Sequence, residues 1–183
     1  VVNNDICIGH CDYFLFEIIK ILYINPIHKQ IKNLERFSMT KMTTEEAFVK
    51  VLQMHGIEHA FGIIGSAFMP ISDLFPKAGI TFWDVAHETN GGLIADGYTR
   101  ATGKMSMVIA QNGPGITGLV TPIKTAYWNH TPLLLVTPQA ANKTMGQGGF
   151  QEVEQMNLFK DMVCYQEEVR DPSRMAEVLN RVI

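Results

Sequence analysis

Apolar residues follow two different spacings along most of this chain. In some segments they form short, nearly continuous runs, and in others they recur every three or four positions between polar residues. The first spacing is typical of strands that are buried on both faces, and the second is typical of helices with one apolar face. The predicted strands are 57–64, 80–86, 105–110, 132–136 and 162–165, and the predicted helices begin near 43, 69, 91, 116, 150 and 171.

The order of these segments predicts the fold class. Strands and helices alternate, which favours an α/β fold, a three-layer sandwich with a mostly parallel central sheet and helices on both faces. Thr43-Thr44-Glu45-Glu46 has the pattern of a capping box, and Asp171-Pro172 has the pattern of an N-cap followed by a first-turn proline. Pro122 lies inside the predicted helix 116–128 and predicts that this helix begins late.

Several distinctive turns follow the predicted strands. They are Gly65-Ser66, the segment at Glu88, the turn 112–115 and the loop after Val136. In a parallel sheet these turns share one edge, beyond the carboxyl ends of the strands, where ligands bind. The sequence therefore predicts a binding site at this edge.

Glu88 is the candidate for proton chemistry at that edge. It follows the apolar run 80–86, and a carboxylate placed beside a buried strand is costly unless it has a partner or a function. The alternative is a helix cap or a solvated loop acid, which the pattern alone favours. The helix expected after Glu88 has an apolar face formed by Leu93, Ile94, Gly97, Tyr98 and Ala101.

The composition narrows the class of protein. The 183 residues are 46% hydrophobic and 18% charged, which suits one globular domain with a substantial core. A net charge of -3 gives no electrostatic argument for nucleic-acid binding, and no apolar run has the length of a membrane span. The three cysteines, Cys7, Cys11 and Cys164, do not form a disulfide framework and favour reduced thiols in the cytoplasm.

Residues 1–38 differ from the rest of the chain. They are rich in Ile, Asn, Lys, Tyr and Phe, and their only glycine is Gly9. We expect an atypical N-terminal extension over 1–38 and the ordered domain over 39–183. Cys7, His10 and Cys11 are metal ligands by type, but no second cluster accompanies them, so no metal site is predicted.

Motifs of other nucleotide-binding and hydrolytic folds are absent. No Gly-x-Gly-x-x-Gly follows the first predicted strand, and there is no P-loop lysine pattern. Ser66 lies in Gly-Ser-Ala, not in Gly-x-Ser-x-Gly, and a turn serine is the simpler interpretation.

A set of short motifs from Met42 onward carries a family resemblance. In order, they are Ala60-Phe61-Gly62, His87-Glu88, Gly97-Tyr98-Thr99-Arg100-Ala101-Thr102-Gly103, Gly113-Pro114-Gly115-Ile116-Thr117, Pro132-Leu133-Leu134 and Phe150-Gln151-Glu152. Together they resemble the pyrimidine-binding domain of thiamine-diphosphate enzymes of the acetolactate synthase superfamily. Within it, the segments 42–48, 62–70 and 125–132 are most similar to the sulfoacetaldehyde acetyltransferases. The chain departs from the superfamily pattern at Gly91, at Gly118 and at Thr89-Asn90.

The resemblance implies roles for four residues. Glu88 would hydrogen-bond the pyrimidine ring nitrogen of thiamine diphosphate and so promote proton loss from the thiazolium carbon. Pro114 would line the pyrimidine pocket, and Phe150 and Gln151 would border the reaction centre. In this family the cofactor carries the chemistry while the protein places and polarises it.

The resemblance also implies a fragment. The central and diphosphate-binding domains, with the magnesium ligands, are expected outside this chain, and the active site is expected to be shared in a homo-oligomer. The implied reaction converts sulfoacetaldehyde and phosphate to acetyl phosphate and sulfite, and the fragment alone is expected to be inactive. Two alternatives stay open, which are a fragment of an acetolactate synthase-like carboligase and a non-catalytic dimerising or regulatory module.

Overall fold

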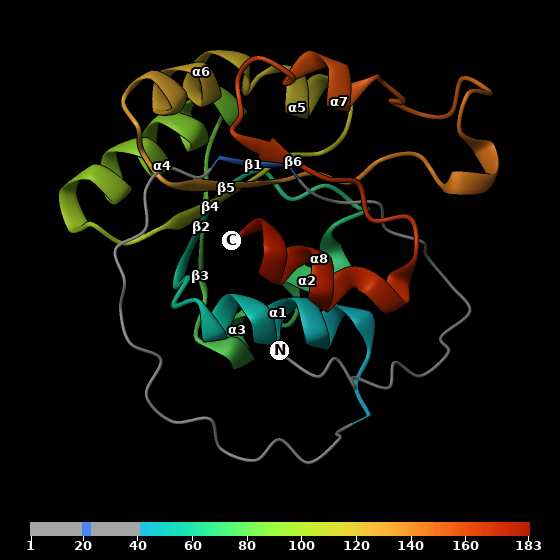
Figure 1. Cartoon of the computed structure of the whole chain (residues 1–183), viewed down its shortest axis with the longest axis horizontal. Helices are drawn as coiled ribbons and strands as arrows, with labels where there is room; N and C mark the ends of the chain where they lie inside the picture. Colours follow the sequence, from blue (N-terminus) through green and yellow to red (C-terminus); the bar gives the residue numbers. More distant parts are fainter. Residues whose placement is uncertain (1–19, 23–40) are drawn as a thin grey trace.

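The computed structural model describes residues 20–22 and 41–183, which form one six-stranded sheet covered by helices (Figure 1). The strands lie in the order β3-β2-β4-β5-β1-β6. Their bounds are β1 Lys20–Leu22, β2 His59–Gly62, β3 Thr81–Asp84, β4 Ser106–Ile109, β5 Leu133–Val136 and β6 Tyr165–Gln166. Neighbouring strands from β3 to β5 are parallel, whereas β1 is antiparallel to both β5 and β6. This mostly parallel sheet confirms the predicted α/β class.

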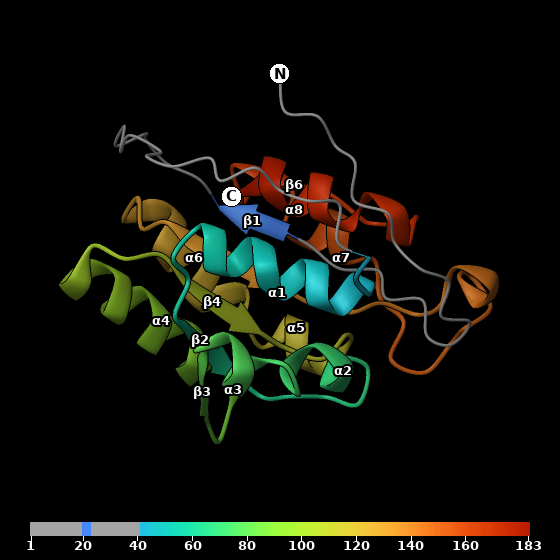
Figure 2. The same cartoon turned by 90° about the horizontal axis from the view of Figure 1, so that it is seen from below.

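Helices cover both faces of the sheet (Figures 1 and 2). One layer consists of α1 Thr44–Met54, α2 Met69–Ser72, α3 Phe75–Ala78 and α8 Met175–Val182. The other consists of α4 Glu88–Thr102, α5 Pro114–Thr117, α6 Val120–Trp128 and α7 Gln155–Leu158. Short 3-10 helices occur at η1 Asn142–Thr144 and η2 Pro172–Arg174. The three layers are those expected from the alternating pattern.

Strands β4 and β5 form the centre of the core. All their residues are buried, and successive side chains enter different layers, as Met107 and Val108 do. Burial of each large apolar side chain contributes about 1.5–3 kcal/mol, so a nearly continuous apolar strand stabilises both helical layers at once. The apolar runs 105–110 and 132–136 predicted these two strands correctly.

Strand β3 corrects one prediction. The apolar run 80–86 indicated a buried strand, but among the strands of the described residues β3 is the last of the sheet and pairs only with β2. Its Trp83 is 51% exposed and donates a hydrogen bond from Nε1 to Nδ1 of His59 at 3.0 Å. Apolar composition alone cannot distinguish an edge strand from a central one.

The packing of α4 corrects a second prediction. Most of the predicted apolar face is turned outward, with Leu93 43% and Ile94 48% exposed, whereas Tyr98 of that face is half-buried and packs against the core. The residues of α4 that are buried are Gly91, Gly92, Ala95, Asp96 and Thr99. A Cβ atom on Gly92 would lie 2.5 Å from Cβ of Pro122, so α4 lies too close to α6 for a larger side chain. Close approach of α4 and α6 therefore requires glycine at position 92 on the inner face.

Smaller features of the helices follow the sequence with some exceptions. The capping box of α1 is formed, with hydrogen bonds of 3.2 Å from Glu46 N to Thr43 Oγ1 and 2.8 Å from Thr43 N to Glu46 Oε2. Pro122 lies in α6, which begins at Val120 after the separate turn α5, so the predicted late start is correct. The predicted helix 150–159 is reduced to α7.

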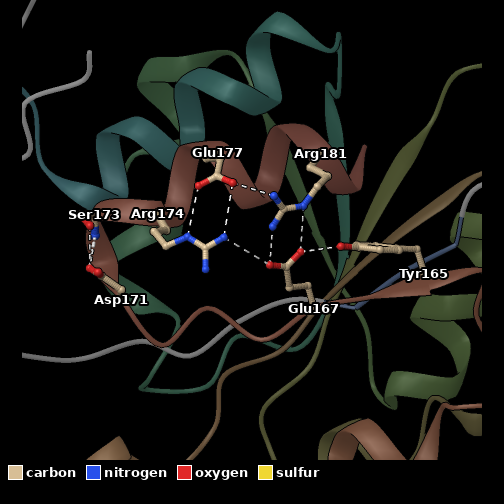
Figure 3. Close-up of polar contacts among 7 residues, drawn as sticks. All are labelled: Tyr165, Glu167, Asp171, Ser173, Arg174, Glu177 and Arg181. Carbon is tan, nitrogen blue, oxygen red and sulfur yellow. Dashed lines mark hydrogen bonds and ion pairs between the residues drawn. The ribbon is translucent and has the colours of Figure 1, made fainter. Parts of the chain in front are cut away.

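Helix α8 is attached to the chain after β6 by a network of ion pairs (Figure 3). Arg181 donates to Glu167 and, at 2.6 Å, to Glu177. Arg174 binds the other side of Glu177, with Nε 3.2 Å from Oε2. The hydroxyl of Tyr165 donates to Glu167 at 2.6 Å. The hydrogen bonds from Arg181 and Tyr165 hold the pKa of Glu167 below its ordinary value.

No helix within the described residues is both long enough and apolar enough to cross a membrane. Over the same residues, no group of three His, Cys, Asp or Glu side chains is arranged to hold a metal ion. The candidate ligands Cys7, His10 and Cys11 lie outside the described residues.

Candidate functional site

Glu88 is the first residue of α4, at the carboxyl edge of the sheet. The helix begins three residues earlier than the predicted start at Gly91, because His87 is extended and caps it, its Nδ1 accepting from Thr89 N at 3.1 Å. The first turn of a helix carries free backbone N–H groups and the positive end of the helix dipole, which favour a negative charge. The fold therefore places the Glu88 side chain at the positive end of the α4 dipole.

The Glu88 side chain lies against the turn that contains Pro114. A Cβ atom on Gly115 would lie 3.2 Å from Glu88 Oε1, so the carboxylate approaches this glycine closely. The Glu88 residue is half-buried, and its carboxylate has no hydrogen-bond or ion-pair partner among the described residues. Its hydrogen-bonding capacity is thus open toward the edge of the sheet.

A second contact fixes α4 to the same turn. Thr89 Oγ1 donates to the backbone carbonyl of Gly118 at 2.6 Å, joining the start of α4 to the junction of α5 and α6. A Cβ atom on Gly118 would contact His87 Cε1 at 3.4 Å and Glu88 Cβ at 3.5 Å. His87 and Thr89, on either side of Glu88, therefore hold the backbone of this acid in place.

The turn itself begins at Gly113, whose φ of 70° is unfavourable for residues with a side chain. A Cβ atom there would lie 2.8 Å from both Cβ and O of Gln151, so only glycine fits beside this residue. Pro114 follows as the first residue of α5 and is exposed. The turn is thus in contact with Glu88 on one side and with Gln151 on the other.

Phe150 and Gln151 lie in the loop between η1 and α7. Gln151 is half-buried and has a φ of 58°, a left-handed conformation that is uncommon outside glycine. The Phe150 side chain is 85% exposed, so the structure does not pack this ring against Glu88. Of the four residues predicted for the site, Glu88, Pro114 and Gln151 are brought to one edge, and Phe150 reaches it through its backbone.

Glu152 closes the loop that precedes this segment. Its carboxylate accepts from Gly146 N at 2.6 Å and from Gly149 N at 2.9 Å. These backbone N–H groups hold the pKa of Glu152 below its ordinary value. The loop is therefore held from within as well as from the neighbouring turn.

Sequence reasoning placed Asn112 in a turn at the site but missed the contacts of its side chain, and it missed the contact of Thr89. Asn112 is 3% exposed and donates from Nδ2 to the carbonyls of Phe150 at 3.2 Å and Gln151 at 2.9 Å. An Asn-Gly pair predicts a turn, but it does not indicate that the side chain reaches a segment 38 positions away. Thr89 was seen only as a departure from the superfamily pattern.

This edge has the chemistry to bind an aminopyrimidine group. Glu88 offers a half-buried carboxylate that has no partner in the part of the chain that the structure describes, and Gly115 leaves beside it a space that any side chain would fill. A carboxyl group so placed can share a proton with a ring nitrogen. The residues present therefore fit the cofactor that the motifs imply.

Comparison with known proteins identifies a family. Residues 42–158 match the model of the thiamine pyrophosphate enzyme, N-terminal TPP binding domain. A sulfoacetaldehyde acetyltransferase from Roseovarius nubinhibens is 87% identical over 143 residues, which cover 78% of this chain and 24% of the relative. A probable sulfoacetaldehyde acetyltransferase from Rhizobium meliloti is 82% identical over the same shares of the two chains. An acetolactate synthase from Arthrospira platensis is 33% identical over 79% of this chain and 26% of its own length.

The fold has a counterpart among solved structures. A thiamine diphosphate-dependent 4-hydroxybenzoylformate decarboxylase from Rhodococcus jostii superposes with a TM-score of 0.73 at 24% identity, covering 78% of this chain and 27% of the decarboxylase. The chain spans about a quarter of the length of the curated relatives that it matches.

Proposed function

The chain belongs to the thiamine pyrophosphate enzyme family, as its N-terminal TPP binding domain, and on this premise we propose that it is the N-terminal part of a sulfoacetaldehyde acetyltransferase. The observation that carries the proposal is the difference in identity, 87% and 82% to two such enzymes against 33% to an acetolactate synthase. The reaction of the whole enzyme would convert sulfoacetaldehyde and phosphate to acetyl phosphate and sulfite.

The proposal assigns residues 39–183 to the pyrimidine-binding domain and leaves 1–38 as an atypical extension. It is supported by the start of the family match at residue 42. Strand β1 lies within 1–38 and is paired on both sides, with β5 and with β6, so these three residues of the extension form a strand of the domain's sheet.

Glu88 has the central role in the proposed mechanism. When bound, thiamine diphosphate supplies a thiazolium carbon that becomes a nucleophile once it has lost its proton. The Glu88 carboxyl group would hold a proton at the pyrimidine ring nitrogen. Its position in the first turn of α4 and its open hydrogen-bonding capacity support this role.

The other predicted residues would shape the site around Glu88. Pro114 would line the pyrimidine pocket, and its neighbour Gly115 would let the carboxylate reach the ring. Gln151 would border the reaction centre, supported by its contact with Gly113. Phe150 would border the same centre from a side chain that is exposed in this chain.

We place the groups that bind magnesium and the diphosphate outside these 183 residues, because the chain matches only 24% of its relatives. The chain alone should therefore bind thiamine diphosphate weakly or not at all and should be inactive. Calorimetry of the chain with thiamine diphosphate and magnesium tests this. Saturable, magnesium-dependent binding in the micromolar range would contradict it.

A homo-oligomer in the cytoplasm is part of the proposal. Large apolar side chains are exposed on α4 and α6, among them Leu93, Ile94 and Trp128, the last 71% exposed. Exposed apolar groups of this kind favour contact with another surface.

The same exposed side chains also favour the second candidate function, a non-catalytic dimerising module. A tight dimer of the chain in analytical ultracentrifugation would support this second candidate, provided that the chain also gives no activity when it replaces the equivalent segment of a related enzyme.

Hybrid enzymes test the first proposal. In the first hybrid, residues 41–183 replace the equivalent segment of the Roseovarius nubinhibens acetyltransferase, and in the second they replace that of the Arthrospira platensis acetolactate synthase. We expect the first hybrid to release sulfite from sulfoacetaldehyde at nearly the rate of its parent and the second to lose acetolactate formation. Acetolactate formation by the second hybrid, with no sulfite release by the first, would favour the carboligase alternative. Inactivity of both folded hybrids would refute an enzymatic role.

A further inference from the structure

Asn112 connects two segments of the site that are far apart in the sequence. It lies directly before the Gly113-Pro114 turn and is 3% exposed. Its Nδ2 donates to two consecutive backbone carbonyls, those of Phe150 at 3.2 Å and Gln151 at 2.9 Å. Its Oδ1 accepts from Gln111 Nε2 at 2.7 Å, so both ends of the buried amide have partners.

The segment that Asn112 holds is strained. Gln151 has a φ of 58°, and a residue with a side chain adopts this conformation at a cost, so other contacts must maintain it. Gly113 lies so close to Gln151 that a Cβ atom on Gly113 would not fit, so the segment at Gln151 is packed directly against the backbone of the turn. A single amide that binds both carbonyls fixes the orientation of two successive peptide groups.

The rest of the loop has its own attachments. Gln139 Nε2 donates to the carbonyl of Val153 at 2.6 Å, and Gln155 Nε2 donates to that of Pro138 at 2.8 Å. Loss of the Asn112 amide should therefore loosen the segment at Gln151 without unfolding the domain.

We propose that Asn112 is a positioning residue of the thiamine site. Its amide holds the Phe150–Gln151 segment against the Gly113–Pro114 turn, so that the Gln151 side chain stands at the edge of the sheet where Glu88 lies. Asn112 itself is buried behind the turn and acts through Gln151, not by touching the cofactor. This inference rests on the proposed function, because it assigns Gln151 to the cofactor site.

Substitution by aspartate is the direct perturbation. Asn112→Asp keeps the size of the side chain but replaces the donor with a carboxylate that two carbonyl oxygens repel. Asn112→Ala removes the donor without adding a charge and serves if the aspartate variant does not fold. Asn142→Asp is the matched control. Asn142 lies in η1, and its Nδ2 also donates to a backbone carbonyl, that of Arg170 at 3.1 Å, which is outside the 149–152 segment.

Hydrogen exchange on the 183-residue chain measures the positioning directly. Within 149–152, the amides of Gly149 and Glu152 donate hydrogen bonds. Loss of the two Asn112 hydrogen bonds should accelerate exchange of these two amides by about tenfold or more in both Asn112 variants. Amides in the first turn of α4 should exchange as before, and Asn142→Asp should leave 149–152 unchanged. Unchanged exchange over 149–152 in the Asn112 variants would overturn the inference.

Cofactor dependence separates a positioning role from a purely structural one. In the Roseovarius hybrid, Asn112→Asp should raise the apparent KM for thiamine diphosphate about tenfold or more, while kcat at saturating cofactor falls much less. Faster exchange with an unchanged KM would show that Asn112 only stabilises the loop. That result would refute the positioning role of Asn112 and leave the proposed function intact. An inactive hybrid without any substitution would count against the proposed function and remove this inference with it.

Discussion

The contact between α4 and α6 at Gly92 yields a sharp prediction, because α4 carries Glu88. A Cβ atom on Gly92 would lie 2.5 Å from Cβ and 2.6 Å from Cγ of Pro122, and 3.1 Å from Cδ2 of Leu119. The ring of Pro122 is rigid and cannot rotate away. Gly92→Ala therefore requires α4 and α6 to move apart.

The expected cost follows from two opposing effects. Overpacking of a core costs about 1–3 kcal/mol, and contacts as short as these place the cost near the upper end. Alanine restores about 1 kcal/mol of helix propensity relative to glycine. Gly92→Ala should therefore lower the free energy of unfolding by about 1–2 kcal/mol.

Gly97 provides the matched control on the same helix. It is exposed, and nothing lies within 4 Å of a Cβ atom built there. Gly97→Ala should raise the free energy of unfolding by up to about 1 kcal/mol. Urea unfolding followed by circular dichroism measures both variants. If Gly92→Ala proved as stable as Gly97→Ala, α4 would not lie on α6 as described, and the placement of Glu88 would lose its basis.

Three further predictions concern the site and the stability of the domain. Gly115→Ala would place a methyl group about 3.2 Å from Glu88 Oε1 and displace the carboxylate, so kcat/KM of the Roseovarius hybrid should fall about tenfold or more with little change in urea midpoint. Thr89→Val removes a hydroxyl that donates to a backbone carbonyl and should cost about 1 kcal/mol in urea unfolding, whereas Thr89→Ser should cost less. The hydrogen bond from Arg181 lowers the pKa of Glu167 in the folded state. The ionised Glu167 therefore contributes its full stabilisation above the ordinary pKa of 4.5, and this stabilisation is lost as the pH falls through the lowered pKa. Melting temperatures measured from pH 7 to pH 3 should fall below about pH 4.5, and less steeply for Glu167→Gln, in which the linked group is absent.

The fold was largely predictable because its central strands are visible in the sequence as continuous apolar runs. The apolar runs that became β4 and β5 are buried on both faces, and the capping box of Thr43 and Glu46 is visible in four consecutive residues. The edge position of β3 was not predictable, because it depends on which strand lacks a neighbour. The inner face of α4 was also missed, since close backbone approach, not hydrophobicity, decides it.

The site was predictable only in part. The position of Glu88 after an apolar run made it a candidate for proton chemistry, but the pattern alone favoured a helix cap or a solvated acid, and its role came from the resemblance. The contact between its carboxylate and Gly115 depends on the relative placement of two turns. Pro114, Phe150 and Gln151 came from resemblance alone. No local pattern indicates that Asn112 reaches the carbonyls of Phe150 and Gln151.

Glu88→Gln in the Roseovarius hybrid tests the role of Glu88 in proton transfer. Glutamine keeps the size and the half-buried position of the side chain but cannot exchange a proton with a pyrimidine nitrogen. Sulfite release should fall about 100-fold or more, while the urea midpoint stays the same. Sulfite release at the rate of the unsubstituted hybrid would show that Glu88 takes no part in proton transfer.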